Sequence, residues 1–296
     1  MYICGRIKLK RILMNFSTSK KVNTFILSVS VFFILASISC SKKAESSNNE
    51  VVFETIQEDK TQSVVHKQSS LKCNLQIKFI YPVNCKATCH LDNLQKLFVG
   101  KFFPSSFANL SPQDAVKEFS AKYIQDFESI RIKDFSDEAT GKDEIDYIYE
   151  QNLEDEILYN QNSFISFLVK STVYEGGAHA VSNNFGYVID LDTEHFITEE
   201  DFAGKDYVKM LSPILTQKIA AANGIDDVSA LEGIGYVIGK IAPNNNFTID
   251  DKGITYYFNE YEIAAYFVGM TEVFIPFEEL RAYIIKGSPI ASLAGR

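Results

Sequence analysis

The stretch EILYNQNSFISFLVKSTVYE, residues 156–175, predicts the fold class most directly. It contains two runs of β-branched, aromatic and other apolar residues, and Asn160-Gln161-Asn162 separates them. A short polar linker between two such runs is typical of a β-hairpin. We therefore expect an antiparallel strand pair near the middle of the chain.

The segments around this hairpin alternate between strand and helix patterns. Residues 71–82 alternate apolar and polar side chains, which predicts a half-buried strand that ends at Pro82. Residues 110–130 form the clearest helix, because Ser111 and Asp114 make a capping box at its start. Further elements are expected as a helix over 91–103, a strand within 183–197, a helix over 206–222 that Pro213 kinks or divides, a hairpin within 244–260, a strand over 272–277 and a helix over 278–284.

This order of elements predicts an α+β fold, in which mostly antiparallel sheets with hairpins pack against helices. The sequence does not decide between one shared core and two subdomains. We place the boundary between the two halves at residue 200, so that the halves cover residues 70–200 and 201–290.

The N-terminal residues have the pattern of an export signal. Basic residues precede an apolar run from Phe25 to Ile38, which is short for a stable membrane span. Cys40 follows that run as in a bacterial lipobox, although Ser37 stands where a leucine is usual. An uncleaved anchor helix is the alternative interpretation, and Met1 and Met14 both fit as the start of translation.

We therefore predict a signal peptide over residues 1–39 and lipidation of Cys40, which would attach the protein to a membrane. Residues 40–69 begin with a polar run and are expected to form a flexible tether. The expected location is the cell envelope, on the periplasmic side of the outer membrane or at the surface.

The charge of the chain limits its partners. The formal net charge is −9, and residues 1–39 carry six Lys and Arg and no acids, so the rest of the chain has a net charge of −15. Such a field repels nucleic acid and attracts a basic protein. Ten acids cluster in residues 134–156, which we interpret as a solvated face, with a docking patch as the alternative.

The cysteines after the signal leave two interpretations open. Cys73, Cys85 and Cys89 allow one disulfide with one thiol left over, and the sequence does not determine the pairing. Cys85, Cys89 and His90 are also candidate metal ligands, but no second pair completes a tetrahedral site. We expect neither a metal nor a cofactor.

Two motifs resemble a known family. YEGGAHAVSNNFGYVIDLDT, residues 174–193, resembles the Tyr-x-Gly-Gly-Ala-His signature of extracytoplasmic domains found in the lysozyme-binding anti-sigma factor RsiV and in the accessory region of the peptidoglycan deacetylase PdaC. Residues 244–280 look like the second half of that family. The resemblance covers residues 70–285 and implies a sensory or binding module. The four histidines of the chain lack the His-x-x-x-His spacing of the deacetylase's catalytic domain.

The glycine motif has a structural and a functional interpretation. Gly176 and Gly177 allow a positive φ or a close backbone approach, and His179 would then pack under the turn. In the functional interpretation, two groups of side chains contact a glycan or a partner protein, since aromatic rings suit both ligands. The candidate ligand-binding residues are Tyr174, Glu175, Gly176, Gly177, His179, Tyr261, Glu262 and Tyr266.

Catalysis has little support in the sequence. Paired carboxylates are available for glycoside hydrolysis, but so acidic a chain always offers some pair. We therefore expect a lipid-anchored, non-enzymatic module that recognises a lysozyme-like cell-wall hydrolase or peptidoglycan. The alternatives are a cell-wall glycan hydrolase and a structural lipoprotein of an envelope complex.

Overall fold

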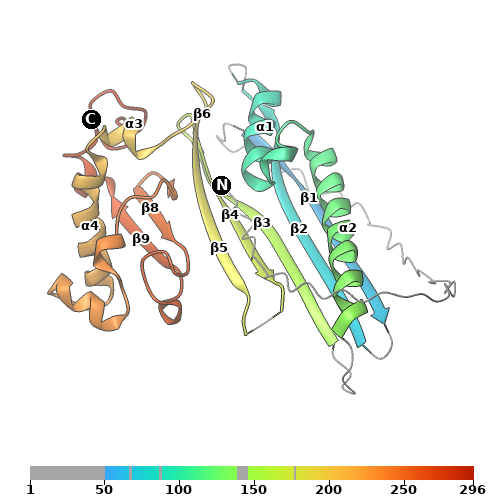
Figure 1. Cartoon of the computed structure of the whole chain (residues 1–296). Coiled ribbons are helices and arrows are strands. Elements are labelled where there is room, and N and C mark those ends of the chain that lie inside the picture. The colour runs from blue at the N-terminus through green and yellow to red at the C-terminus, as the bar shows by residue number, and fades with distance from the viewer. Residues whose placement is uncertain (1–50, 67–68, 87–88, 139–145, 177) are drawn as a thin grey trace, which may run out of the picture. The chain divides into compact units, whose positions relative to one another are not determined.

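The computed structural model describes residues 51–66, 69–86, 89–138, 146–176 and 178–296, so the predicted signal peptide and Cys40 lie outside the described residues. A six-stranded sheet has the order β1-β2-β3-β4-β5-β6, and a three-stranded sheet has the order β7-β8-β9 (Figure 1). Among the described strand pairs, β2 with β3 is parallel and the others are antiparallel, which confirms the predicted α+β class.

The strands are β1 (Val51–His66), β2 (Ser69–Cys85), β3 (Asp146–Gln161), β4 (Phe164–Tyr174), β5 (Val181–Asp190), β6 (His195–Phe196), β7 (Phe247–Ile249), β8 (Gly253–Phe258) and β9 (Thr271–Pro276). The α-helices are α1 (Leu91–Phe102), α2 (Pro112–Glu138), α3 (Glu199–Ala203), α4 (Tyr207–Ala222) and α5 (Phe277–Leu280), and the 3-10 helices are η1 (Ser105–Phe107), η2 (Val228–Ile234), η3 (Ile238–Lys240) and η4 (Tyr266–Val268).

Strand β1 shows that the prediction of a tether reaching residue 69 is wrong. Residues 51–66 pair with β2 along the whole strand, from Val51 opposite Cys85 to His66 opposite Ser69. Among the described strands β1 lies at the edge of the sheet, where polar and charged side chains are common. This composition looked like a linker in the sequence. Any tether must therefore end before Val51.

Two local features of the strands also differ from expectation. β2 continues through Pro82, because the register shifts between Val52 and Phe53 opposite it and a bulge accommodates the missing N–H. The turn between β3 and β4 lies at Asn162 and Ser163, whose φ values are 55° and 62°. Positive φ at both central residues is the geometry of a two-residue hairpin turn that follows the twist of the strands.

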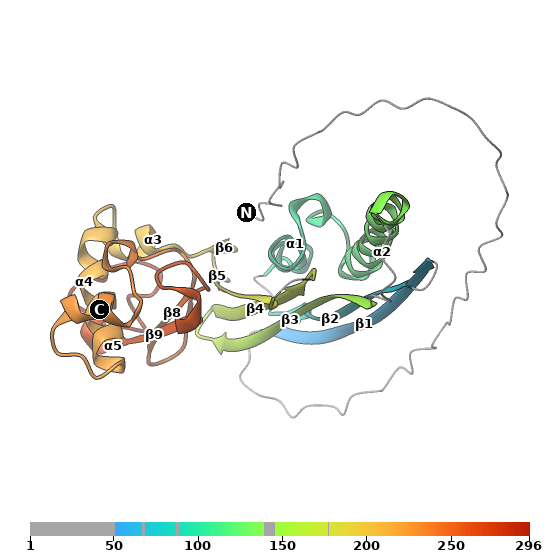
Figure 2. The same ribbon diagram turned by 60° about the horizontal axis from the view of Figure 1, so that its bottom comes forward.

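Helices α1 and α2 cover one face of the six-stranded sheet (Figure 2). Aromatic side chains fill the interface: Phe98 stacks on Phe167 at 4.3 Å between ring centroids, and Phe79 contacts Phe102 and Phe103 at 4.5 and 5.3 Å. No described helix covers the opposite face of this sheet. Because side chains alternate along a strand, that open face receives the polar positions.

The three-stranded sheet has its own core with α4. Leu215 of α4 and Tyr256 of β8 are both completely buried in it. Pro213 lies inside α4, which continues through it from residue 207 to residue 222, so the predicted division of this helix does not occur. Among the described helices, none has a stretch long and apolar enough to cross a membrane.

The two sheets meet along β5, which contacts β7 and β8. The chain leaves the larger sheet at Phe196 and enters the smaller sheet at Phe247, and the predicted boundary at residue 200 lies between these two points. Both sheets nevertheless belong to one compact unit that spans residues 48–296.

Candidate functional site

The predicted glycine turn follows the end of β4 at Tyr174. Gly176 has a φ of 86°, which glycine adopts without strain, so the predicted positive φ is confirmed there. Gly177 lies outside the described residues. Glu175 is exposed, and so is His179. The expectation that His179 packs under the turn is therefore wrong, although its Nδ1 lies 3.1 Å from the Ala180 carbonyl oxygen.

The fold brings the two predicted clusters together in an aromatic stack of His179, Tyr266 and Tyr261. The rings of His179 and Tyr266 are 4.0 Å apart between centroids and 17° from parallel. Those of Tyr266 and Tyr261 are 5.4 Å apart and 24° from parallel. Tyr261 is 58% exposed and has a φ of 65°. The stack thus ends in an exposed ring on a strained backbone.

Glu262 has a structural role in the described fold. Its Oε1 accepts a hydrogen bond from Asn244 Nδ2 at 2.7 Å, and its Oε2 accepts one from the backbone N–H of Asn259 at 2.8 Å. Both carboxylate oxygens are therefore engaged within the protein.

An asparagine network joins β5 to the smaller sheet. Asn246 Oδ1 accepts from the backbone N–H of Gly186 at 2.6 Å, while Asn246 Nδ2 donates to the carbonyls of Asn184 and Tyr257. Asn259 Oδ1 accepts from the backbone N–H of Asn184 at 2.7 Å. These amides satisfy backbone groups between two sheets that share no continuous strand ladder. Among the asparagines of the two motifs, Asn246 and Asn259 take part through their side chains and Asn184 through its backbone.

The open face of the larger sheet holds a groove that sequence reasoning missed. Its volume is about 530 Å³, and its floor comes from β3, β4 and β5 while β8 and the segment around β9 supply a wall. We call it the acidic groove, because Glu154, Glu156 and Glu272 line it together with Lys170. Its other lining residues are Leu158, Leu168, Ser171, Thr172, Ser182, Asn183, Asn184, Tyr257 and Met270.

Lys170 is the cation among these acids. Its Nζ lies 2.9 Å from Glu156 Oε2 and 4.0 Å from Glu154 Oε1. The hydrogen bond with Glu156 raises the pKa of Lys170, and Glu154 and Glu272 add to that shift. Three carboxylates face one ammonium group, so the groove keeps an excess of negative charge.

The sequence did contain a signal for this groove. Side chains at the even positions of β3 between residues 148 and 158 are exposed on the open face. Glu150, Glu154 and Glu156 are part of the acidic segment 134–156 and lie on β3. The alternation of these acids with buried Tyr149 and Leu153 could have indicated a single acidic face of a strand.

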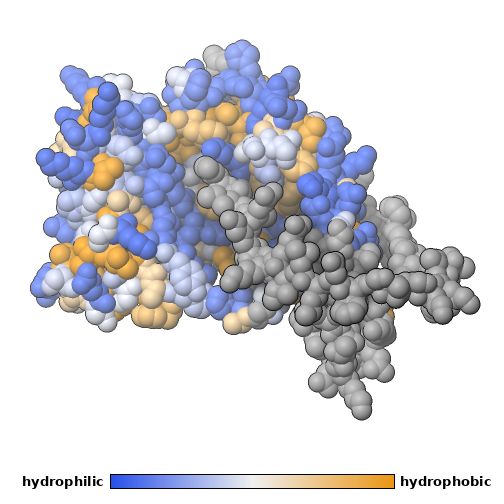
Figure 3. Space-filling model, viewed as in Figure 1, coloured by the Kyte–Doolittle hydropathy of each residue, from blue (hydrophilic) through white to orange (hydrophobic). Residues whose placement is uncertain are grey.

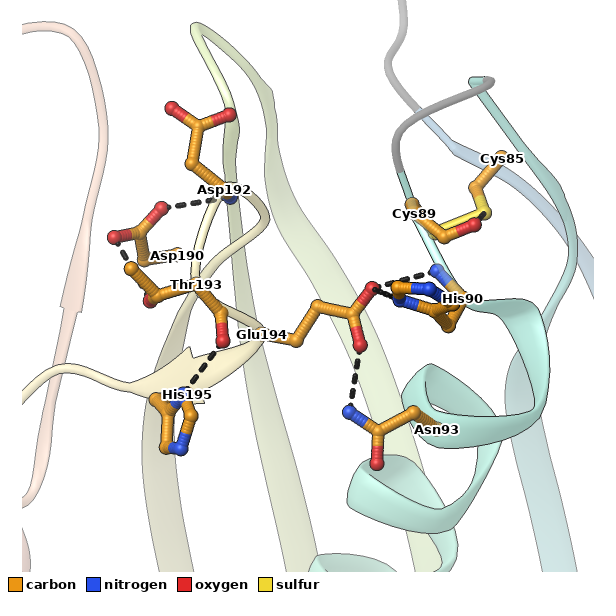
Figure 4. A network of polar contacts seen from close by, with 9 residues as sticks. All are labelled: Cys85, Cys89, His90, Asn93, Asp190, Asp192, Thr193, Glu194 and His195. Carbon is orange, nitrogen blue, oxygen red and sulfur yellow. Dashed lines mark hydrogen bonds and ion pairs between the residues drawn. A yellow bond between two sulfur atoms is a disulfide. The ribbon is translucent and has the colours of Figure 1, made fainter.

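The loop after β5 contacts the start of α1 through Glu194, and we call this contact the clamp (Figure 4). Glu194 accepts hydrogen bonds from the His90 backbone N–H at 2.6 Å and from Asn93 Nδ2 at 2.6 Å, and its carboxylate lies 2.9 Å from His90 Nδ1. Burial opposes ionisation of Glu194, but these hydrogen bonds outweigh it and hold its pKa below the usual value. A carboxylate at a helix N-terminus is also favoured by the helix dipole.

The structure shows which cysteines form a disulfide, and this disulfide lies next to the clamp (Figure 4). Cys85 and Cys89 form a disulfide, and Cys73 is a buried free thiol (Figure 4). Disulfide sulfurs are not thiolate ligands, so the alternative of a metal site at Cys85, Cys89 and His90 is excluded in this structure. Burial raises the pKa of Cys73 to about 11.

The two described carboxyl groups with a raised pKa are buried inside the protein. Asp155 is 1% exposed and Glu199 is completely buried. Burial raises the pKa of both carboxyl groups, even though backbone N–H groups of Ile80 and Asn245 donate to them. Neither carboxyl can reach a polymeric substrate. A ligand in solvent can therefore contact the exposed acids of the groove, but not these two buried acids.

Comparisons with known proteins agree with this fold. Residues 197–278 match the family model described as "Protein of unknown function (DUF3298)". A solved structure of a DUF3298 family member from Bacteroides fragilis NCTC 9343 is 27% identical with a TM-score of 0.74, covering 83% of this chain and 98% of that one. A DUF3298 family protein from Pseudomonas aeruginosa PAO1 is 13% identical with a TM-score of 0.53, covering 81% and 96%, and shows a similarity of fold alone.

One curated relative also matches. The peptidoglycan-N-acetylmuramic acid deacetylase PdaC of Bacillus subtilis (strain 168) is 27% identical over 175 residues. The match includes 57% of this chain but only 35% of that protein. The relative is thus much longer than the region it shares with this chain.

Proposed function

We propose that this protein is a non-enzymatic binding module of the cell envelope, anchored through Cys40, whose ligand is a basic cell-wall hydrolase of the lysozyme kind. The acidic groove is the observation that supports this proposal. It places Glu154, Glu156 and Glu272 on an open surface of a chain whose net charge after residue 39 is −15. Opposite charges speed the encounter of two proteins and fix their orientation.

The relatives support an envelope location. The name of the Bacillus subtilis relative places its activity on peptidoglycan, which lies outside the cytoplasm. Our chain shares about a third of that relative's length. We infer that the shared part provides recognition rather than deacetylation.

A glycan hydrolase is the alternative function. It needs an acid with a raised pKa next to a carboxylate in a substrate cleft. The described carboxyls with a raised pKa, Asp155 and Glu199, are closed off from solvent, whereas the groove acids surround Lys170. This arrangement supports binding over cleavage.

Isothermal calorimetry with hen lysozyme tests the proposal. The soluble protein should span residues 48–296, since this compact unit includes β1 and corresponds in extent to a domain that has been solved on its own. We expect saturable binding at low salt that weakens as salt rises through the range where the Debye length falls from ~30 to ~10 Å. An absence of lysozyme binding at low salt would contradict the proposal.

A turnover assay on purified muropeptides separates the two functions. We expect no product from the wild-type protein. Product that disappears in Glu156→Gln or Glu272→Gln would favour the hydrolase instead.

A further inference from the structure

Tyr261 combines exposure with backbone strain. Its side chain is 58% exposed, yet its φ of 65° lies in the left-handed region that bulky side chains avoid. Such strain persists where the surrounding fold imposes it, and it concentrates at ligand-binding positions. Packing does not explain the choice of tyrosine here, because more than half of the side chain is in solvent.

The aromatic stack holds this ring in a fixed orientation. One face of Tyr261 packs on Tyr266, and Tyr266 in turn packs on His179. An exposed ring that is already immobilised loses little side-chain entropy when a ligand covers it. The stack therefore presents a rigid, flat and uncharged tyrosine surface to solvent.

The residue that follows Tyr266 in the chain is a second exposed aromatic residue. Phe267 is 77% exposed and lies against Gly235, where an added Cβ would be 2.5 Å from the ring. Apolar patches interrupt the hydrophilic surface over the C-terminal elements, at the lower left of Figure 3. A ligand with a flat C–H face would match these exposed rings.

We propose that the aromatic stack is a binding site for a pyranose ring of an N-acetylated, β-linked glycan. The C–H face of such a sugar packs on an exposed aromatic ring such as that of Tyr261. A neutral sugar also avoids the repulsion that the acidic field exerts on anionic polymers. This site goes beyond the proposed hydrolase binding and does not depend on it.

The stack and the acidic groove are close along the chain. Ser182 and Met270 line the groove, and they lie three and four residues along the chain from His179 and Tyr266.

Titration with tri-N-acetylchitotriose, followed by calorimetry on residues 48–296, tests the site. We expect the wild-type protein to bind, and Tyr261→Phe to bind equally because the ring is kept. Tyr261→Gly should weaken binding about tenfold or more, since it removes the stacking ring. Tyr283→Ala is the matched control, because it removes another partly exposed tyrosine, 37% exposed, outside the stack.

Tyr261→Gly also separates binding from folding. Glycine adopts the positive φ without strain, so the melting temperature of this variant should be equal to or higher than that of the wild type. Loss of sugar binding at an undiminished melting temperature would support the site. Unchanged sugar binding in Tyr261→Gly, or no binding by the wild type at millimolar sugar, would overturn it. Lysozyme binding by the same variant should persist, so a failure of either proposal can be recognised separately.

Discussion

At the scale of single residues, Gly186 determines how closely β5 and the smaller sheet approach each other. A Cβ on Gly186 would lie 2.6 Å from the backbone carbonyl carbon of Phe247, and its N–H already donates to Asn246. The contacting residues are about 60 positions apart in the sequence. In the sequence these residues appear only as parts of two motifs. The folded structure is needed to show that they contact each other.

Gly186→Ala should destabilise the protein. The added methyl group collides with backbone atoms that cannot rotate away, and overpacking of this kind costs about 1–3 kcal/mol or more. Chemical denaturation of residues 48–296 measures the change in the free energy of unfolding. Gly233→Ala is the control, because an added Cβ there meets nothing within 4 Å. Equal stability of Gly186→Ala and the control would contradict the close approach.

At the scale of elements, the sequence predicted those whose signals are local. Of the capping box predicted at the start of α2, the N-cap half is confirmed, since the Asp114 N–H donates to Ser111 Oγ. Ser111 Oγ in turn donates to the Asp114 carboxylate. The central hairpin is also confirmed. β1 was missed because its polar edge composition resembles a linker, and the parallel pairing of β2 with β3 was missed because α1 and α2 separate them in the chain.

The clamp between the turn after β5 and α1 predicts a pH dependence of stability. Glu194 has a lowered pKa in the folded protein, so its stabilising contribution is complete above the unfolded value near 4.5 and is lost as pH falls through the folded pKa. Glu194→Gln should therefore reduce stability by about 1 kcal/mol at pH 7 and have less effect at low pH.

Denaturation of this variant between pH 3 and pH 7 provides the measurement. Asp192→Asn is the matched control, because it removes the charge of an exposed acid in the same turn. If the two variants lose the same stability at every pH, the clamp does not act through the Glu194 carboxylate.

At the scale of the whole molecule, the proposed function depends on the net charge and on the shape of the surface. The net charge and the separate members of the aromatic stack could be predicted from the sequence. The sequence did not show that the segment between β4 and β5 brings His179 onto Tyr266, nor that acids on β3 and β9 converge on Lys170. The contact of His179 with Tyr266 and the approach of Glu272 to Lys170 join residues far apart in the sequence.

The association rate of hen lysozyme with residues 48–296, measured across a series of salt concentrations, tests the central claim most directly. The variant Glu156→Gln/Glu272→Gln neutralises the acidic groove, and Glu118→Gln/Asp126→Asn removes two exposed acids of α2 on the other face of the sheet. We predict that the groove variant associates about threefold to tenfold more slowly at low salt and shows a flatter salt dependence, whereas the α2 variant behaves like the wild type. Equal rates for both variants, or no loss in the groove variant, would contradict the account.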